Sequence, residues 1–223
     1  MRVKAVLFDA YGTLFDVHSV AALAESLFPG QGAALSQAWR TRQLEYTWLR
    51  TLSNRYRDFW QVTGDALSWA AEALRLPLTS AQHAQLLDAY LHLQPFPENL
   101  DVLRSLHASG MVLGTLSNGT PSMLAAAIES AGVSGLFAHV LSVDAIGRYK
   151  TDADAYALGT QAVGAPAGEI AFVSSNCWDA IGATWFGYRT FWVNRGSAPM
   201  DRLDVFPEGT GSSLGDLPQF LAA

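Results

Sequence analysis

Cysteine and charged residues are scarce in this sequence. Cys177 is the only cysteine among 223 residues, which excludes a disulfide framework within the chain and a zinc site built from several thiolates. Charged residues make up 15% of the chain and hydrophobic residues 50%, so the composition favours a sizeable folded core over general disorder. The formal net charge is 14 − 20 = −6, which argues against nucleic acid or an anionic membrane as a partner.

Long hydrophobic runs and the common histidine motifs are also missing. The first apolar run, 3–8, is too short to cross a bilayer, and Asp9 ends it too early for a signal peptide. We therefore expect a cytoplasmic protein with no membrane partner. None of the five histidines has another histidine four residues away, and no G-x-S-x-G motif occurs, so a histidine metal site and Ser-His-Asp chemistry are poorly supported.

The hydrophobic pattern predicts an α/β fold with a helical insertion. After residue 97, short apolar runs alternate with helical periods, which is typical of a parallel sheet with helices on both faces. We predict strands at 3–8, 111–116, 139–143, 170–174 and 189–193, and helices at 98–109, 121–131, 152–163, 178–186 and 216–221. Between residues 16 and 93 only helical periods occur, at 17–28 with Asp16 as the cap, 35–52, 59–74 and 80–93.

Polar residues follow the predicted strands at four places, which are 9–14, 117–119, the loop around Lys150, and 174–179. In open parallel sheets, ligands bind beyond the carboxyl ends of the strands. Such residues could do no more than cap the helices that follow, but four coincident clusters favour an active site. Asp9 ends an apolar strand, and a poorly hydrated carboxylate is a good nucleophile. Gly12 allows a tight turn in which Thr13 can hydrogen-bond Asp9.

Four motifs lie in these segments. They are Asp9-Ala10-Tyr11-Gly12-Thr13-Leu14, Leu116-Ser117-Asn118-Gly119, Tyr149-Lys150, and Ser174-Ser175-Asn176-Cys177-Trp178-Asp179. In kind and order they resemble the motifs of the haloacid dehalogenase superfamily. The resemblance implies a Rossmann-like three-layer core with a mainly parallel sheet, plus an all-helical cap inserted after the first strand. The expected domains are a core of residues 1–15 and 97–223 and a cap of residues 16–96.

Two positions differ from the pattern of the phosphatases, which make up most of this superfamily. Phosphatases resemble D-x-D-x-T, and the second aspartate protonates the leaving group; here Tyr11 takes that place, and an unperturbed tyrosine pKa of about 10 makes a poor acid. Phosphatases also carry an acidic pair after the fourth strand. Here Ser175 replaces the first acid and only Asp179 remains, which removes a carboxylate of the kind that Mg²⁺ prefers. We expect neither a metal nor another cofactor.

The chain instead resembles the type II L-2-haloacid dehalogenase branch, including an arginine on an early cap helix, Arg40. The resemblance implies hydrolytic dehalogenation of (S)-2-haloalkanoic acids to (R)-2-hydroxyalkanoic acids plus halide. Asp9 attacks C2 with inversion and forms an ester, and Lys150 keeps Asp9 ionised. Arg40 and Asn118 cradle the departing halide, and Ser117 holds the substrate carboxylate.

The resemblance also implies roles for residues around this centre. Those expected to position Lys150 and the hydrolytic water, or to support them by hydrogen bonds, are Ser174, Asn176, Asp179, Thr13 and Tyr156. Backbone N–H groups near Ala10 and Tyr11 are expected to bind the substrate carboxylate. The residues expected on the alkyl side of the pocket are Tyr11, Leu44, Phe59 and Trp178, although aromatic residues at this spacing are as often simple core.

Alternatives remain open at this point. On helical period alone, Arg40 reads as an exposed helix arginine. The chain could also be a superfamily phosphatase with degenerate motifs, or a non-catalytic member that binds a partner. The expected partners are small 2-haloalkanoates, halide and a second copy of the chain in a homodimer, with Trp39, Tyr46 and Trp48 as candidate interface residues.

Overall fold

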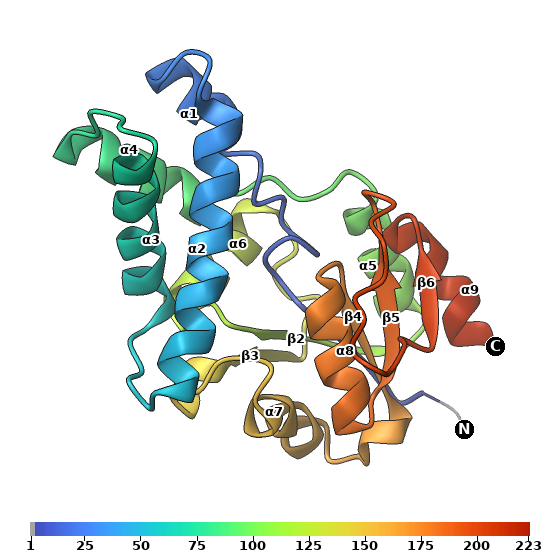
Figure 1. Cartoon of the computed structure of the whole chain (residues 1–223). Coiled ribbons are helices and arrows are strands. Elements are labelled where there is room, and N and C mark those ends of the chain that lie inside the picture. Colours follow the sequence, from blue (N-terminus) through green and yellow to red (C-terminus); the bar gives the residue numbers. More distant parts are fainter. Residues whose placement is uncertain (1–2) are drawn as a thin grey trace.

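The central element is a six-stranded sheet in which every pairing is parallel, with strand order β3-β2-β1-β4-β5-β6. The computed structural model describes residues 3–223, so residues 1–2 of the expected core domain lie outside the described residues. The strands are β1 Ala5–Phe8, β2 Val112–Ser117, β3 His139–Ser142, β4 Ile170–Ser174, β5 Arg189–Val193 and β6 Gly209–Gly211. The expected α/β class is confirmed (Figure 1).

Helices cover both faces of this sheet because its strands are apolar on both sides. Successive residues of β1 alternate between two buried clusters: Val6 and Phe8 join the cluster with α5 and α6, whereas Leu7 joins the cluster with α7 and α8. The helices of this part are α5 Asn99–Ala108, α6 Pro121–Ser130, α7 Ala153–Val163, α8 Cys177–Phe186 and the short α9 Leu217–Ala222. Because β1 pairs in parallel with both β2 and β4, the carboxyl ends of these three strands lie at one edge of the sheet.

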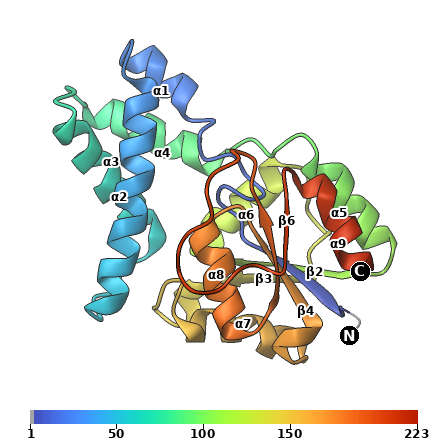
Figure 2. The same cartoon turned by 45° about the vertical axis from the view of Figure 1, so that its right-hand side comes forward.

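Four further helices lie together beside that edge (Figure 2). They are α1 Ala21–Leu27, α2 Gly32–Leu52, α3 Phe59–Ala73 and α4 Ser80–Leu91. α3 and α4 begin at side-chain caps, Asp58 and Thr79 respectively, which satisfy backbone N–H groups of the first turn. Among residues 3–223, no helix is both long and apolar enough to cross a membrane.

The two segments that connect these four helices to the sheet run side by side. Phe15 forms an antiparallel bridge with Pro95. The backbone N–H of Asp16 donates to the carbonyl of Gln94 at 2.8 Å, and that of Phe96 donates to the carbonyl of Leu14 at 3.3 Å. The segments therefore form a short hydrogen-bonded ribbon directly after the Asp9 loop.

Two local predictions differ from the structure by more than a small shift of their bounds. Helix α1 begins at Ala21, because Asp16 closes a turn instead of capping a helix: its carboxylate accepts from the N–H of His18 at 2.9 Å. Strand β6, Gly209–Gly211, was not predicted, since G-T-G carries no apolar pattern. It lies at the sheet edge, where Thr210 donates a hydrogen bond to the carbonyl of Trp192.

Candidate active site

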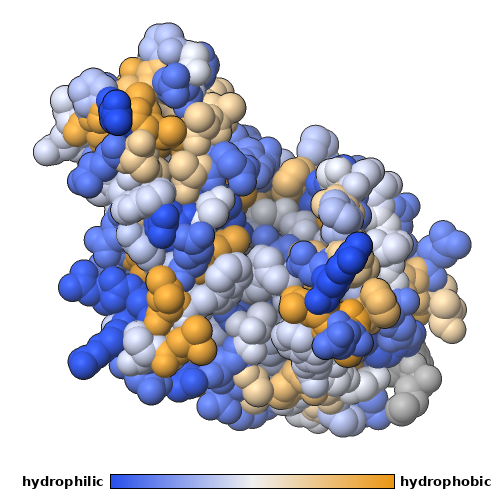
Figure 3. All heavy atoms as spheres, in the orientation of Figure 1, coloured by the Kyte–Doolittle hydropathy of each residue, from blue (hydrophilic) through white to orange (hydrophobic). Residues whose placement is uncertain are grey.

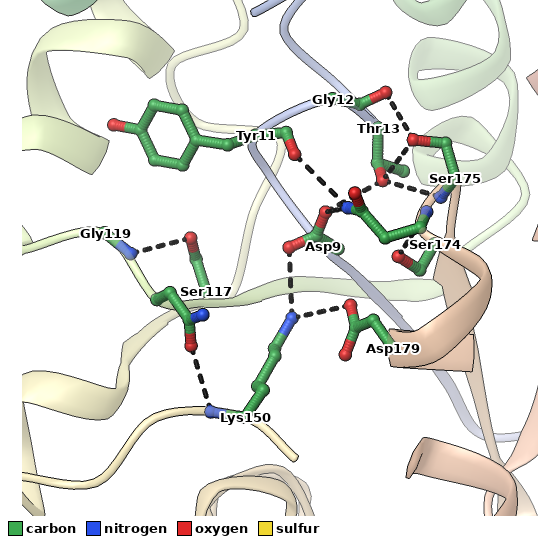
Figure 4. A network of polar contacts seen from close by, with 12 residues as sticks. Asp9, Tyr11, Gly12, Thr13, Ser117, Gly119, Lys150, Ser174, Ser175 and Asp179 are labelled. Carbon is green, nitrogen blue, oxygen red and sulfur yellow. Dashed lines mark hydrogen bonds and ion pairs between the residues drawn. The ribbon is translucent and has the colours of Figure 1, made fainter. Parts of the chain in front are cut away.

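Asp9 lies at the centre of a polar network at the carboxyl edge of the sheet (Figure 4). It directly follows β1 and is only 6% exposed. Its Oδ1 accepts from Lys150 Nζ at 3.0 Å, while Oδ2 accepts from Thr13 Oγ1 at 2.9 Å and from Asn176 Nδ2 at 3.0 Å. Because donors contact both oxygens, this carboxylate is held in one orientation.

Lys150 joins two carboxylates inside the protein. Its side chain is 0% exposed, and Nζ lies 3.0 Å from both Asp9 Oδ1 and Asp179 Oδ2. Burial lowers the pKa of Lys150, but the nearby charges of Asp179 and Asp9 raise it more, so that its pKa lies above the usual lysine value. The ammonium group is therefore charged at neutral pH.

Asp179 is fixed from its other side by Tyr156. The Tyr156 hydroxyl donates to Asp179 Oδ1 at 2.8 Å, and both residues are fully buried. Burial raises the pKa of Asp179, although Lys150 opposes the shift. Burial and the Asp179 charge raise the pKa of Tyr156 well above its usual value, so Tyr156 remains a protonated hydrogen-bond donor.

The hydroxyl groups beside Asp9 are committed to the loop itself. Thr13 Oγ1 donates to Asp9 and accepts from the N–H of Ser175 at 2.8 Å, while the Ser175 hydroxyl donates to the carbonyl of Gly12. The Lys150 ammonium lies between the two carboxylates of this site, those of Asp9 and Asp179. Within the described part of the chain, no group of three or more His, Cys, Asp or Glu side chains could hold a metal ion.

Arg40 reaches this centre from α2. Its Nη2 contacts the Tyr11 carbonyl at 3.3 Å and Asn176 Oδ1 at 3.4 Å, and its Nη1 donates to Gln43 Oε1 at 2.7 Å. It is therefore not the exposed helix arginine that its helical period alone suggests. Gln43, fully buried, also donates to Thr63 Oγ1 at 2.7 Å. No sequence motif points to Gln43; its place one turn after Arg40, on the same helix face, is the only signal for it.

Ser117 and Asn118 extend the network on the β2 side of Asp9. The Ser117 hydroxyl accepts from the N–H of Gly119 at 3.1 Å, and its own proton can still be donated to a ligand. Asn118 Oδ1 accepts from the backbone N–H of Lys150 at 3.1 Å, so the amide group of Asn118 holds the lysine loop against β2. Ser174 accepts from the N–H of Asn176 at 3.1 Å and is fully buried.

The Tyr11 side chain turns away from Asp9 (Figure 4). Its ring stacks on Tyr90 at 5.6 Å between centroids and packs against Phe59 at 5.8 Å. Burial, Tyr90 and Asp9 raise the pKa of Tyr11 well above its usual value, which makes it an even poorer proton donor than free tyrosine. The ring needs Gly119 opposite it, because a Cβ at that position would lie 2.5 Å from Tyr11 Cε2.

The remaining predicted pocket residues lie in different surroundings. Ala10 is fully buried, and its carbonyl accepts from the N–H groups of Thr13, Leu14 and Phe15, which forms the tight loop after β1. Trp178 packs edge-on against Trp48 of α2 at 5.5 Å.

A cavity of about 580 Å³ is lined by Trp178, Trp48 and Lys150, among other residues. Leu44 is half-buried one turn after Arg40, and the structure describes no contact between its side chain and the Asp9 network.

The chain is similar to known haloacid dehalogenases in sequence and in fold. A family model for haloacid dehalogenase-like hydrolases matches residues 3–187. An (S)-2-haloacid dehalogenase of Pseudomonas sp. strain YL is 46% identical over 95% of this chain and 91% of its own length. The solved L-2-haloacid dehalogenase RSc1362 is 55% identical, with a TM-score of 0.98 and coverage of 100% of both chains.

A second solved structure carries a bound group. It is the L-2-haloacid dehalogenase from Xanthobacter autotrophicus with chloropropionic acid covalently bound; it is 38% identical, with a TM-score of 0.92 and coverage of 99% of both chains. From the family model and these relatives, the chain belongs to the haloacid dehalogenase-like hydrolases, in the branch of the (S)-2-haloacid dehalogenases.

Proposed function

We propose that this chain is a hydrolase that converts (S)-2-haloalkanoic acids into (R)-2-hydroxyalkanoic acids and halide, through an ester on Asp9. The observation that carries the proposal is the buried Asp9 carboxylate, held by Lys150, Thr13 and Asn176 with Arg40 beside it. The covalent chloropropionic acid complex of the Xanthobacter relative supports an ester intermediate.

In the first step, an Asp9 oxygen attacks C2 and the carbon–halogen bond breaks with inversion. Halide leaves as an anion and needs no proton, so the site can work with Tyr11 in place of an acid. Arg40, with Asn118, would stabilise the negative charge that develops on the halogen. Electrostatic attraction between a cation and a developing negative charge is stronger in a site shielded from water than in water itself. Ser117 and the backbone N–H groups near Ala10 and Tyr11 would hold the substrate carboxylate.

In the second step, water attacks the carbonyl carbon of the Asp9 ester, and the bond between that carbon and the product oxygen breaks. Lys150 and Asp179 lie beside Asp9 and would orient the water and the ester. Tyr156 keeps Asp179 in place. Ser174 and Asn176 shape the loop on the other side of the carboxylate.

We further propose two domains, a core of residues 1–15 and 97–223 and a helical cap of residues 16–96. The hydrogen-bonded ribbon around Asp16 and Gln94 would be the junction between them. Arg40 would then belong to the cap and Asp9 to the core, so that the site is complete only when the two meet.

The protein is further proposed to be cytoplasmic and to form a homodimer. The prediction that Trp39 lies in the dimer interface is wrong, since Trp39 is only 2% exposed and donates to the Thr63 carbonyl inside the helical layer. Leu49 is 57% and Trp69 36% exposed on α2 and α3, and Figure 3 shows apolar side chains among hydrophilic ones over the lower part of α2. This face would be covered by the second copy.

The origin of the product oxygen tests the covalent route. In a single turnover with enzyme in excess in H₂¹⁸O, we expect ordinary oxygen at C2 of the hydroxyacid and ¹⁸O in the peptide that contains Asp9. The reason is that Asp9 makes the new C–O bond, and water enters only at the Asp9 carbonyl carbon. Mass spectrometry of product and peptide gives both readings.

Multiple turnovers provide the control, since label must then pass from Asp9 into later product molecules. Labelled product together with an unlabelled peptide in the first turnover would show that Asp9 only activates water, and would overturn the ester mechanism.

Arg40→Lys is expected to lower kcat by about 10²-fold or more, nearly as much as Arg40→Ala. A lysine ammonium is a compact point charge and cannot contact Tyr11, Asn176 and Gln43 with one planar group. Steady-state halide release from (S)-2-chloropropanoate measures the effect.

Arg42→Lys is the matched control on the same helix, because Arg42 pairs with Glu45 and lies over Trp69, away from Asp9. Its kcat should stay within about twofold of wild type. Full activity in Arg40→Lys would show that Arg40 acts only through its positive charge and that the contacts of its planar group are not needed.

A further inference from the structure

Thr13 is held at both ends, by its side chain and by its backbone. Its hydroxyl donates to Asp9 and accepts from the N–H of Ser175. Its carbonyl accepts from Asn99 Nδ2 at 3.1 Å and from Arg195 Nη2 at 3.3 Å. The second pair of contacts lies outside the Asp9 network and has no part in the mechanism described so far.

Asn99 is the first residue of α5 and is only 1% exposed. Besides its bond to Thr13, its Nδ2 donates to the carbonyl of Leu14 at 2.9 Å, and its Oδ1 accepts from Arg195 Nη2 at 3.3 Å. A buried side-chain amide is costly unless its groups are paired. Here it is paired with the backbone directly after the nucleophile loop.

Arg195 follows β5 and is fixed on several sides. It pairs with Glu98 at 3.0 Å, and its guanidinium lies 3.7 Å from the centroid of Phe96. Its side chain is 20% exposed. Glu98 and Phe96 border the second connecting segment, so this one guanidinium contacts both segments of the ribbon.

We infer that Arg195 and Asn99 are positioning residues. They fix the Thr13 backbone and thereby direct the Thr13 hydroxyl towards Oδ2 of the Asp9 carboxylate. The inference rests on the proposed function of Asp9 as the nucleophile. Asp9 Oδ2 accepts hydrogen bonds from Thr13 and Asn176. Rotation of the Thr13 peptide would move the Thr13 hydroxyl away and break the first of these two hydrogen bonds. A displacement of about 1 Å in a reacting group can cost about 10²-fold in rate.

The chain contains a matched control at the other end of the same strand. Arg189 begins β5, pairs with Glu208 at 2.6 Å, and lies over the ring of Phe220 at 5.3 Å. Both arginines thus combine a glutamate partner with a phenylalanine ring. Of the two, Arg195 has a described hydrogen bond to Thr13, and it lies at the carboxyl end of β5, where the site is.

The test is a double-mutant cycle on kcat for halide release from (S)-2-chloropropanoate. Arg195→Met should lower kcat about tenfold with KM within about twofold, as expected for loss of a charged hydrogen bond that acts on the transition state. Thr13→Val removes the hydroxyl. In the Thr13→Val background, Arg195→Met should lower kcat by less than about twofold, because the effects of substitutions at residues that act through one another are not additive. Arg189→Met should leave kcat unchanged in both backgrounds.

Asn99→Asp keeps the shape of the side chain and removes its donor to Thr13, so it should lower kcat in the same way if the folded protein forms. An equal tenfold loss for Arg195→Met in both backgrounds would overturn the inference. So would equal losses for Arg195→Met and Arg189→Met, which would indicate a general structural effect.

A crystal structure of Arg195→Met tests the placement without any substrate. Thr13 Oγ1 should move beyond hydrogen-bond distance, about 3.5 Å, from Asp9 Oδ2, while in Arg189→Met it should stay within it. An unmoved Thr13 overturns the inference. Absence of halide release from the wild type would count against the proposed function alone, and the crystal structures would still decide the role of Arg195.

Discussion

Asp9→Asn is expected to abolish halide release, with a loss of about 10⁴-fold or more in kcat. An amide has nearly the same shape as a carboxylate but is barely nucleophilic, so no ester can form at this position. The side chain keeps an oxygen that Lys150, Thr13 or Asn176 can still contact. Circular dichroism should therefore show an intact fold, and halide release under saturating substrate measures the loss.

Asp16→Asn is the matched carboxylate control, since Asp16 closes a turn in the connecting ribbon and lies outside the Asp9 network. It should retain activity. Turnover near the wild-type rate in Asp9→Asn, after mass spectrometry has excluded deamidation back to aspartate, would remove Asp9 from the mechanism.

Lys150→Met is expected to damage both stability and activity. It removes the ammonium between Asp9 and Asp179 and leaves two buried carboxylates without their shared cation. Removal of one partner from a buried ion pair costs about 3–5 kcal/mol in the free energy of unfolding. We expect a loss of this size in urea denaturation, together with a fall in kcat of about 10³-fold.

A second substitution tests whether the loss of stability comes from the two unpaired carboxylates. In Lys150→Met, the added change Asp179→Asn should restore part of the unfolding free energy but no activity, because one uncompensated charge is removed while the cation is still missing. Lys4→Met should change stability little, since Lys4 is 61% exposed in its pair with Glu169. A Lys150→Met protein as stable as wild type would contradict the view that Lys150 holds the two carboxylates together.

The elements that the sequence predicts well are those whose signal is local. β4, Ile170–Ser174, and β5, Arg189–Val193, agree with their predicted bounds because each is a short apolar run between turns. β6 could not be predicted in this way, because its three residues gain strand geometry only by pairing with β5. Asp16 shows the reverse error, since this good capping residue closes a turn five residues before the helix begins at Ala21.

The same distinction holds for the site. Asp9, Ser117 and Ser174 could be grouped from sequence because each ends or directly follows a strand of one parallel sheet. Gln43, Asn99 and Arg195 could not, since each is an ordinary polar residue on or beside an element, and its contact with Thr63 or Thr13 joins segments that lie apart along the chain. What makes them important is packing between distant segments, which no local pattern records.

The contrast between the two lysines has a practical consequence for attaching the protein to a surface. Amine-reactive reagents need an accessible ammonium, and of the two lysine side chains Lys150 is 0% and Lys4 61% exposed. Lys4 directly precedes β1, whereas Asp9 directly follows it. Coupling through lysine therefore tethers the molecule by the amino end of its central strand, with the reacting end of that strand directed away from the support.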